Sequence, residues 1–404
     1  MRIVYLNQYF NTLDMAGSTR SYEMARRLVA WGHEVHMVTS WREPTNTRSW
    51  FTTEEAGIQV HWLPVPYNNN MRYGKRMRAF FKFAWGAARK AASLPADVVF
   101  ATSAPLTIAL PGVYAARRQK VPMVFEVRDL WPEAPIAVGA IKNPVAIAAA
   151  RTLEQVAYRS SSRIVALAPR VARGVIAAGY PEGQVEVIPN GSDLDLFRDA
   201  AAGIEGFLKE YPFLRGRKLV VYVGAIGLVN GVERLVEIAH RMRDEPDVGF
   251  VIVGAGRQTG LVQERARRAG VLGRNFFMLG SVSKQVVPTV LAASTVAVAT
   301  VLNDDRRLHG DSMNKVFDYL AAGKPIACAF EGWLSRTVCR HGAGFEVPRE
   351  PESAAAALAS KLSDEAWLET AGLRARMLAE SRFSRESQAW QLDAVLCSSV
   401  RRSA

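Results

Sequence analysis

Residues 218–242, KLVVYVGAIGLVNGVERLVEIAHRM, contain the stretch of the chain that decides its fold. A β-branched apolar run passes through Gly224, Gly227 and Gly231 into a segment with helical periodicity. Glycines between a strand and a helix let the backbone approach a ligand closely, and open α/β sheets bind ligands at this place. The spacing matches neither the dinucleotide fingerprint nor the P-loop, so neither of those sites is predicted.

The same alternation of apolar runs and amphipathic segments extends along the whole chain. Strands are predicted at RIVYLN, EVHMVTS, IQVHWLP, DVVFATS, PMVFEVRD, RIVALA, VEVIPNG, KLVVYVG, VGFVIVG, NFFMLG, TVAVATV, PIACAF and GFEV. Apolar strands separated by helical crossovers predict parallel sheets covered on both faces. We therefore predict two doubly wound, Rossmann-like α/β domains, residues 1–195 and 196–380. Residues 381–404 are predicted to form a C-terminal helix that packs back toward the N-terminal domain.

The composition narrows the classes of function. The 404 residues are 49% hydrophobic and 22% charged, and no apolar stretch has the length of a membrane-spanning helix. We expect no signal peptide, because MRIVYLNQYF begins directly with a strand-like run. The three cysteines form no C-x-x-C pair, which predicts neither a disulfide framework nor a zinc site and fits a reducing cytoplasm. The net charge of +13 favours anionic partners.

Part of this charge is concentrated in residues 71–90, MRYGKRMRAFFKFAWGAARK, which hold seven Lys or Arg and no acid. At about 100° per residue, the segment predicts a helix with Phe80 and Phe81 on its apolar face and Trp85 at a border. Basic amphipathic helices with aromatic edges bind anionic membrane surfaces. The predicted membrane-contacting residues are Arg76, Arg78, Phe80, Phe81, Lys82 and Trp85. The alternative is a surface helix that packs its apolar face on its own sheet.

Between the first strand and the first helix, the chain places Gly17, Ser18, Thr19 and Arg20 at a helix start. Free backbone N–H groups and an arginine at such a position suit an anion. These four residues are predicted to bind the acceptor substrate. The alternative is a helix N-cap made by Ser18 or Thr19.

Residues 309–325, HGDSMNKVFDYLAAGKP, predict a short helix from about Met313 to Ala321, capped by Ser312 and ended by Gly323 and Pro325. Lys315 falls in its first turn, where a lysine costs a few tenths to about 1 kcal/mol. Its presence therefore predicts a negative ligand, and helix N–H groups with a lysine suit a diphosphate. Asp318, one turn further, is placed to accept bonds from ribose hydroxyls. The alternative is an exposed Lys–Asp pair.

Several motifs together resemble a known family. VIPNGSDLDLF, YVGAIGLVNGVERLV, FVIVGAGRQTGLV, FMLGSV and NKVFDYLAAGKPI follow the order and spacing seen in the retaining GT-B glycosyltransferases of family 4. EVRDLWPE and the opening LNQYF…GSTRSYEMARRL are similar to the branch of L-fucosamine transferases in O-antigen and capsule assembly. The resemblance implies a GT-B fold, with a sugar nucleotide on the C-terminal domain, an acceptor on the N-terminal domain and the reaction in the cleft.

The resemblance also implies donor-binding positions. The base would be bound around Gly280, Ser281 and Val282. The diphosphate and sugar would be bound by loop and helix-start residues, and the ribose by a carboxylate. The donor-binding residues implied outside the base site are Gly224, Gly227, Asn230, Gly254, Asp311, Ser312, Met313, Asn314, Lys315 and Asp318.

The sequence departs from the family at three places. One is the E-x7-E pattern of the family, in which Gly310 stands where the first glutamate is usual, so sugar contacts are expected from Asp311, Ser312 or local backbone. The loop after the first strand of the second domain has Ala225 and Asn230 where many members carry an arginine and a lysine, so Lys315 is expected to meet the phosphate charge. The His-Asp pair of many relatives is Arg128-Asp129 here. We therefore predict Arg128, Asp129 and Lys315 as the catalytic residues.

We accordingly predict a retaining transferase that moves an N-acetylated amino sugar, such as FucNAc, from a UDP-linked donor to a polyprenyl-diphosphate-linked acceptor. It is expected to lie on the cytoplasmic face of the inner membrane and to need no metal or other cofactor. Asp193 and Asp195 imitate a D-x-D metal motif, but we interpret them as a helix-capping feature. The alternatives are a sugar-nucleotide epimerase or phosphorylase, and a nucleic-acid-binding protein; nucleic acid is not an expected partner.

Overall fold

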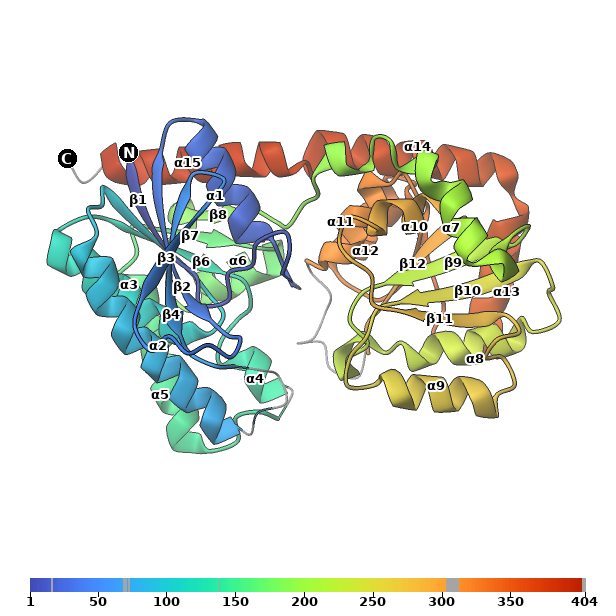
Figure 1. Ribbon diagram of the computed structural model, residues 1–404, viewed down its shortest axis with the longest axis horizontal. Coiled ribbons are helices and arrows are strands. Elements are labelled where there is room, and N and C mark those ends of the chain that lie inside the picture. The colour runs from blue at the N-terminus through green and yellow to red at the C-terminus, as the bar shows by residue number, and fades with distance from the viewer. Residues whose placement is uncertain (16, 68–70, 72, 138, 303–311, 402–404) are drawn as a thin grey trace. The chain divides into compact units, whose positions relative to one another are not determined.

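The computed structural model describes residues 1–15, 17–67, 71, 73–137, 139–302 and 312–401 (Figure 1). The chain folds as two compact units. Residues 1–189 and 386–404 form the N-terminal unit, and residues 190–385 form the C-terminal unit. The boundary between the two domains that was predicted from the sequence lies after residue 195, six residues later than the observed one.

The N-terminal unit is built on an eight-stranded sheet with the order β3-β4-β2-β1-β5-β6-β7-β8. All neighbouring strands are parallel except β3 and β4, which pair antiparallel from Phe51↔Trp62 to Glu55↔Ile58. The strands are β1 (Arg2–Leu6), β2 (Glu34–Trp41), β3 (Phe51–Glu55), β4 (Ile58–Pro64), β5 (Val98–Thr102), β6 (Met123–Val127), β7 (Arg163–Ala166) and β8 (Val185–Val187).

Helices cover both faces of this sheet (Figure 1). Its α-helices are α1 (Arg20–Ala30), α2 (Tyr73–Ser93), α3 (Ala109–Gln119), α4 (Glu133–Ala137), α5 (Pro144–Arg159), α6 (Pro169–Ala177) and the part of α15 (Arg385–Arg401) from residue 386 on; η1 (Leu106–Ile108) and η2 (Glu182–Gln184) are short 3₁₀ turns. Along β1, Val4 and Leu6 contact the α2, α3, α5 and α6 side, whereas Ile3 and Tyr5 contact α1 and α15. This alternation is the period of two expected of a strand buried on both faces.

The C-terminal unit is built on a six-stranded parallel sheet with the order β11-β10-β9-β12-β13-β14. Its strands are β9 (Lys218–Val223), β10 (Val248–Val253), β11 (Phe276–Gly280), β12 (Val296–Thr300), β13 (Ile326–Ala329) and β14 (Gly344–Glu346). Its α-helices are α7 (Ile204–Glu210), α8 (Glu233–Arg241), α9 (Thr259–Arg268), α10 (Val287–Ala293), α11 (Asn314–Ala321), α12 (Trp333–Arg340), α13 (Pro351–Ser363) and α14 (Glu365–Arg382); the 3₁₀ turns are η3 (Leu194–Phe197), η4 (Ala200–Gly203), η5 (Pro212–Leu214) and η6 (Leu228–Asn230).

Two apolar layers enclose this second sheet. Side chains from α7, α10, α11, α12 and α14 form the core on one face, and α8, α9 and α13 form the core on the other. Two doubly wound α/β domains are thereby confirmed. Within the described residues, no helix is both long and apolar enough to cross a membrane.

Candidate active site

The candidate donor site lies where the C-terminal sheet changes its direction of growth. Strands β9 and β12 are neighbours in the middle of the sheet, and the chain adds strands outward from both. Ligands of open α/β sheets bind beyond the carboxyl ends of the strands at such a point. The loop after β9 and the segment after β12 meet here, since the Leu302 N–H donates to the Val229 carbonyl at 2.8 Å.

Glycines let the strand ends approach one another closely at this edge. Gly224 has φ +153°, and a Cβ on it would lie 3.2 Å from the Lys315 Nζ. Gly254 has φ +144°, and a Cβ on it would lie 1.9 Å from the Gly224 carbonyl oxygen. The Gly254 N–H in turn donates to the Gly280 carbonyl at 2.7 Å. Three glycines predicted to contact the donor therefore lie on adjacent strand ends, where side chains would fill the space.

The predicted base-binding residues follow the third of these strand ends. Gly280 and Ser281 are exposed and Val282 is half-buried, so the backbone of this segment is accessible to a ligand. Gly227, the remaining glycine of the prediction, is half-buried in the loop after β9, and its carbonyl accepts from the Asn230 N–H at 3.0 Å.

Lys315 lies in the first turn of α11 and is held at the end of β9. Its Nζ donates to the Tyr222 hydroxyl at 2.7 Å and to the Asn230 Oδ1 at 3.2 Å. The ammonium also lies 4.2 Å from the centroid of the Tyr222 ring. Within the described part of the chain, no carboxylate pairs with Lys315. The interpretation as an exposed Lys–Asp pair is therefore wrong, because Asp318 pairs with a different lysine.

The surroundings disfavour the charge on this lysine. Burial lowers the pKa of Lys315 to about 7. A cation held by two neutral oxygens and a ring face has polar partners, but no negative charge among the described residues compensates it. A bound anion would supply that charge and favour the charged form.

Asp318 is buried, with 8% of its surface exposed. Its Oδ1 accepts from the Ser192 hydroxyl at 2.9 Å, and its Oδ2 pairs with the Lys284 ammonium. A ribose would therefore have to compete with two existing partners of this carboxylate. Lys284 was not among the predicted site residues, although it lies two residues after the FMLGSV motif, in the loop between β11 and α10.

The start of α11 differs from the predicted cap. The N-cap residue is Met313, and no side chain makes a capping hydrogen bond there. Ser312 instead accepts from the Asn190 N–H through its hydroxyl at 3.1 Å and from the Asn190 side-chain amide through its carbonyl at 2.8 Å. The proposed Ser312 cap is thus wrong, and the first N–H groups of α11, including that of Asn314, receive no side-chain cap. Asp311 lies outside the described residues.

In the N-terminal unit, Arg20 is not available to a substrate. Its side chain is 0% exposed, and its Nε and Nη2 bond the Glu126 carboxylate at 3.1 and 2.9 Å. Nη1 and Nη2 also donate to the carbonyls of Pro189 and Ile188. Assigning Arg20 to the acceptor was therefore wrong: it is a buried structural cation. Thr19 is the N-cap of α1 but makes no side-chain capping bond, so the capping alternative is wrong for Thr19. Its contact with the acceptor stays a prediction.

Glu126 balances this buried charge. Burial alone would raise the pKa of the Glu126 carboxyl. The nearby Arg20 and Arg128 charges and the hydrogen bond from the Thr102 hydroxyl together lower it by more, so the net shift of the pKa is downward. The carboxylate is consequently ionised and fully buried at neutral pH.

Arg128 and Asp129 follow β6 at the carboxyl edge of the N-terminal sheet. The Arg128 N–H donates to the Ser103 hydroxyl at 3.0 Å, and its Nη2 donates to the Ser18 hydroxyl at 3.3 Å. Asp129 is exposed. The structure therefore brings Arg128 together with Ser18 and the exposed Gly17, from the loop predicted to bind the acceptor. It leaves the Arg128 guanidinium half-buried at this edge.

The basic segment forms α2, but its faces differ from the prediction. Phe80 and Phe83 are buried in the core at 5% and 0% exposure, whereas Phe81 and Trp85 are exposed at 52% and 68%. The assignment of Phe80 to a membrane contact is therefore wrong. Exposed basic residues flank Phe81 and Trp85; they are Lys75, Arg78, Lys82 and Arg89, and the Arg89 guanidinium lies 4.9 Å from the Trp85 ring centroid. Arg76 instead lies over the Tyr67 ring, 5.6 Å from its centroid.

Asp193 and Asp195 are engaged in ion pairs. Asp193 pairs with Arg385 at 3.2 Å, and Asp195 pairs with Arg198. Asp193 is the N-cap residue of η3, as the capping interpretation requires. Its carboxylate makes no capping hydrogen bond, however, so the interpretation is correct for the position of the residue and wrong for its role. Among the described residues, no cluster of three or more His, Cys, Asp or Glu is arranged to hold a metal.

Comparisons with known proteins add the family context. Residues 16–191 match the model of the glycosyl transferase 4-like domain, and residues 217–364 match that of glycosyl transferases group 1. A putative colanic acid biosynthesis glycosyl transferase, WcaI of Escherichia coli K12, is 24% identical over 83% of this chain and 85% of its own length. The D-inositol 3-phosphate glycosyltransferase of Nocardiopsis dassonvillei is 27% identical over 63% of this chain and 60% of its own length.

Solved structures share the fold. Sucrose-phosphate synthase of Thermosynechococcus elongatus superposes with a TM-score of 0.77 at 18% identity, covering 100% of both chains. Anabaena HepE in complex with UDP and glucose superposes with a TM-score of 0.72 at 16% identity, covering 98% of this chain and 100% of its own. WaaG, a glycosyltransferase involved in lipopolysaccharide biosynthesis, has a TM-score of 0.69 at 15% identity, with 98% and 99% covered. Two glycosyltransferase domain models that match successive parts of the chain, together with this fold, identify it as a GT-B glycosyltransferase.

Proposed function

We propose that the protein transfers a sugar, with retention of its anomeric configuration, from a UDP-linked donor to a polyprenyl-diphosphate-linked acceptor in surface polysaccharide synthesis. The donor sugar of the proposal is an N-acetylated amino sugar such as FucNAc. One observation carries the donor assignment: Lys315 is a half-buried cation without an anionic partner among the described residues, at the start of a helix whose N-cap residue makes no side-chain capping bond. A diphosphate supplies the missing charge and accepts the free N–H groups.

The relatives support the substrate classes of this proposal. HepE is seen in complex with UDP, with UDP and glucose, and with UDP-glucose. WcaI is named for colanic acid biosynthesis and WaaG is described as acting in lipopolysaccharide biosynthesis. The proposal combines the nucleotide sugar bound by HepE with the glycan synthesis for which WcaI and WaaG are named. The proposed location is the cytoplasmic face of the inner membrane, with the exposed basic and aromatic residues of α2 on the lipid surface.

The proposed mechanism assigns charge stabilisation to the C-terminal unit. As the bond between the sugar and the diphosphate breaks, negative charge grows on the leaving phosphate. The Lys315 ammonium and the α11 N–H groups are placed to stabilise that charge. Arg128, on the N-terminal unit, supplies a second fixed positive charge for phosphate or for a sugar amide. Transfer on the face from which the diphosphate departs accounts for retention without an enzymic nucleophile, and positioning then contributes most of the rate.

A donor screen tests this proposal. We expect one UDP-sugar to raise the melting temperature more than the matched GDP- and dTDP-sugars, because a ligand that binds the folded state stabilises it. Free UDP should then appear at an appreciable rate only after a lipid-linked acceptor is added. Release of UDP or sugar phosphate at the full rate without acceptor would instead support the epimerase or phosphorylase alternative.

A further inference from the structure

A pocket lies in the N-terminal unit. It has a volume of about 370 Å³ and is lined mainly by Asp14, Met15, Trp41, Arg42, Glu43 and Tyr67. This volume lies within the range of small-molecule sites, roughly 300–1,000 Å³. Trp41 is the last residue of β2, and the other five follow β1, β2 or β4, so the pocket is at the carboxyl edge of the parallel strands, where such sheets bind ligands.

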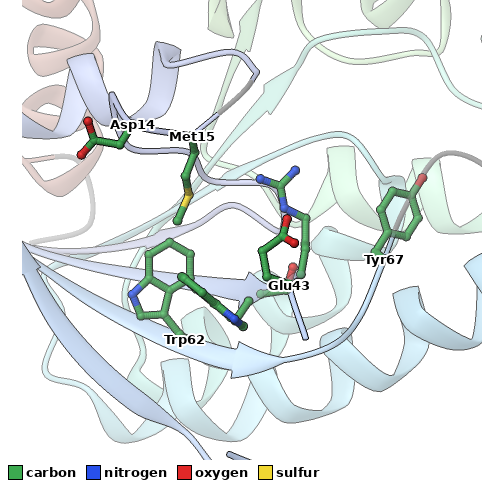
Figure 2. Close-up of a pocket in the computed structure, with 8 residues that line it drawn as sticks. Asp14, Met15, Glu43, Trp62 and Tyr67 are labelled. Atoms are coloured by element: carbon green, nitrogen blue, oxygen red, sulfur yellow. The ribbon is translucent and has the colours of Figure 1, made fainter. Parts of the chain in front are cut away.

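Aromatic rings form one part of the pocket and are fixed by their neighbours. Trp62, with 2% of its surface exposed, donates its indole N–H to the Thr53 hydroxyl at 2.9 Å. Trp41 packs edge-on against it, with ring centroids 5.3 Å apart at 88°. Figure 2 shows Met15 pointing toward Trp62 and Tyr67 at the opposite end, with the Glu43 side chain between them in this view. The half-buried Trp41 and Tyr67 are the rings that a ligand can contact, and the buried Trp62 fixes Trp41 in place. Such pre-ordered rings need little ordering when a ligand binds.

Charged and polar groups form the other part. The Asp14 and Glu43 carboxylates only accept hydrogen bonds at neutral pH, and the Arg42 guanidinium only donates them. Arg42 is held by the Asn11 Oδ1, and the Asn11 amide also donates to the Ser18 carbonyl at 3.1 Å. Asn11 therefore links the pocket to Ser18, whose hydroxyl binds Arg128.

The combination of aromatic rings with charged groups indicates which part of the proposed acceptor fits the pocket: the polyprenyl chain, the diphosphate or a sugar ring. A polyprenyl chain would bury Arg42, Glu43 and Asp14 without giving them partners, which is costly. A diphosphate would meet two carboxylates and one guanidinium that already has a partner. A pyranose ring fits both parts, because its C–H face packs on aromatic rings while its hydroxyls donate to carboxylates and accept from a guanidinium.

We propose that the pocket between Trp41, Trp62 and Tyr67 binds an uncharged sugar ring of the acceptor, with Glu43 and Arg42 as the hydroxyl-reading groups. This inference rests on the proposed function for the identity of the ligand as an acceptor. The pocket itself is a binding site for a neutral pyranose, and Glu43 is a specificity-determining residue that discriminates by the position of a hydroxyl.

The test uses the full-length protein and the exposed Glu43, whose replacement leaves the core unchanged. Saturation-transfer NMR would measure binding of the methyl glycosides of glucose, galactose, fucose and N-acetylglucosamine, with inorganic pyrophosphate as an anionic competitor. We expect at least one glycoside to bind, and Glu43→Gln to weaken its binding about tenfold through loss of a charged hydrogen bond. The matched control Glu182→Gln, an exposed acid on η2 of the same unit, should bind as the wild type does.

Three results would overturn the assignment. In the binding experiment these are that no glycoside binds, or that pyrophosphate displaces the bound glycoside. A kinetic measurement distinguishes a local effect at the pocket from a general structural one: Glu43→Gln should raise the KM for acceptor about tenfold while the thermal shift by the UDP-sugar stays unchanged. The third result is an equal rise in the acceptor KM for Glu182→Gln. If glycosides bind as expected but no nucleotide sugar shifts the melting temperature, the pocket stands and the proposed transferase function fails.

Discussion

At the residue scale, the position of Lys315 carries most of the functional argument. Its place in a first helical turn could be predicted from the sequence, because the apolar periodicity and the glycine and proline that follow define a short helix. Its partners could not, since Tyr222 lies 93 residues away and is brought near only by the sheet. The same holds for Lys284 and Asp318, which are paired across 34 residues.

Removing the Lys315 charge should weaken donor binding. We expect Lys315→Met to lower the affinity for the UDP-sugar about tenfold to a hundredfold, because a hydrogen bond to a charged group contributes about 1.5–3 kcal/mol. Isothermal titration calorimetry would measure this change. Lys209→Met, on the exposed surface of α7, is the matched control. Equal affinities in all three proteins would remove Lys315 from the donor site.

The pKa of Lys315 predicts a pH dependence. The free protein holds this pKa near 7, and a bound diphosphate favours the ammonium and raises it. Donor affinity should therefore be greatest below about pH 7 and should fall as the pH rises from 7 toward the pKa of the complex. Titrations in buffers of different ionisation enthalpy should detect proton uptake above pH 7. A pH-independent affinity, or the same slope in Lys315→Met, would contradict this expectation.

The buried pair of Arg20 and Glu126 predicts a stability effect of a different kind. Glu126→Gln keeps the side-chain shape but leaves the Arg20 charge buried and uncompensated, which should destabilise the protein by about 3–5 kcal/mol. Thermal unfolding followed by circular dichroism should show a clear loss for Glu126→Gln and little change for Glu182→Gln. An unchanged melting temperature would mean that the Arg20 charge is compensated by another group.

At the element scale, α2 shows what periodicity does and does not determine. The sequence predicted a helix here, and the structure has 21 residues of it. Periodicity leaves two aromatic stripes, and only docking on the sheet selects the stripe that contains Phe80, Phe83 and Ala87 for the core. The exposed stripe of α2 contains Phe81 and Trp85. The helix α3, which packs along α2, also exposes Leu110 and Tyr114.

This exposed stripe predicts membrane binding that depends on charge. Replacing Lys75, Arg78 and Lys82 with glutamate should release the protein from anionic vesicles, since each basic residue contributes roughly 1 kcal/mol near such a surface. The control carries the same charge change on the other unit, at Lys209, Arg243 and Arg340. Co-sedimentation that persists in the α2 variant, or is lost equally in the control, would contradict the membrane assignment.

At the scale of the whole molecule, the parallel sheets could be predicted because buried parallel strands read as continuous apolar runs. The antiparallel strand β3, FTTEE, was missed because it is a polar strand at the edge of its sheet, with alternating exposure and no apolar run. The acceptor pocket was missed for a related reason. Trp41 is the last residue of β2, and Trp62 lies within β4. Only the pairing of β2 with β4 brings these two aromatic residues together.

The most direct test of the account is a crystal structure of the protein with its UDP-sugar bound. We predict that the diphosphate lies beyond the carboxyl ends of β9 and β12, with an oxygen within hydrogen-bond distance of the Lys315 Nζ and another on the N–H groups that begin α11. A diphosphate bound elsewhere, with the Lys315 Nζ still on the Tyr222 hydroxyl, would contradict the account.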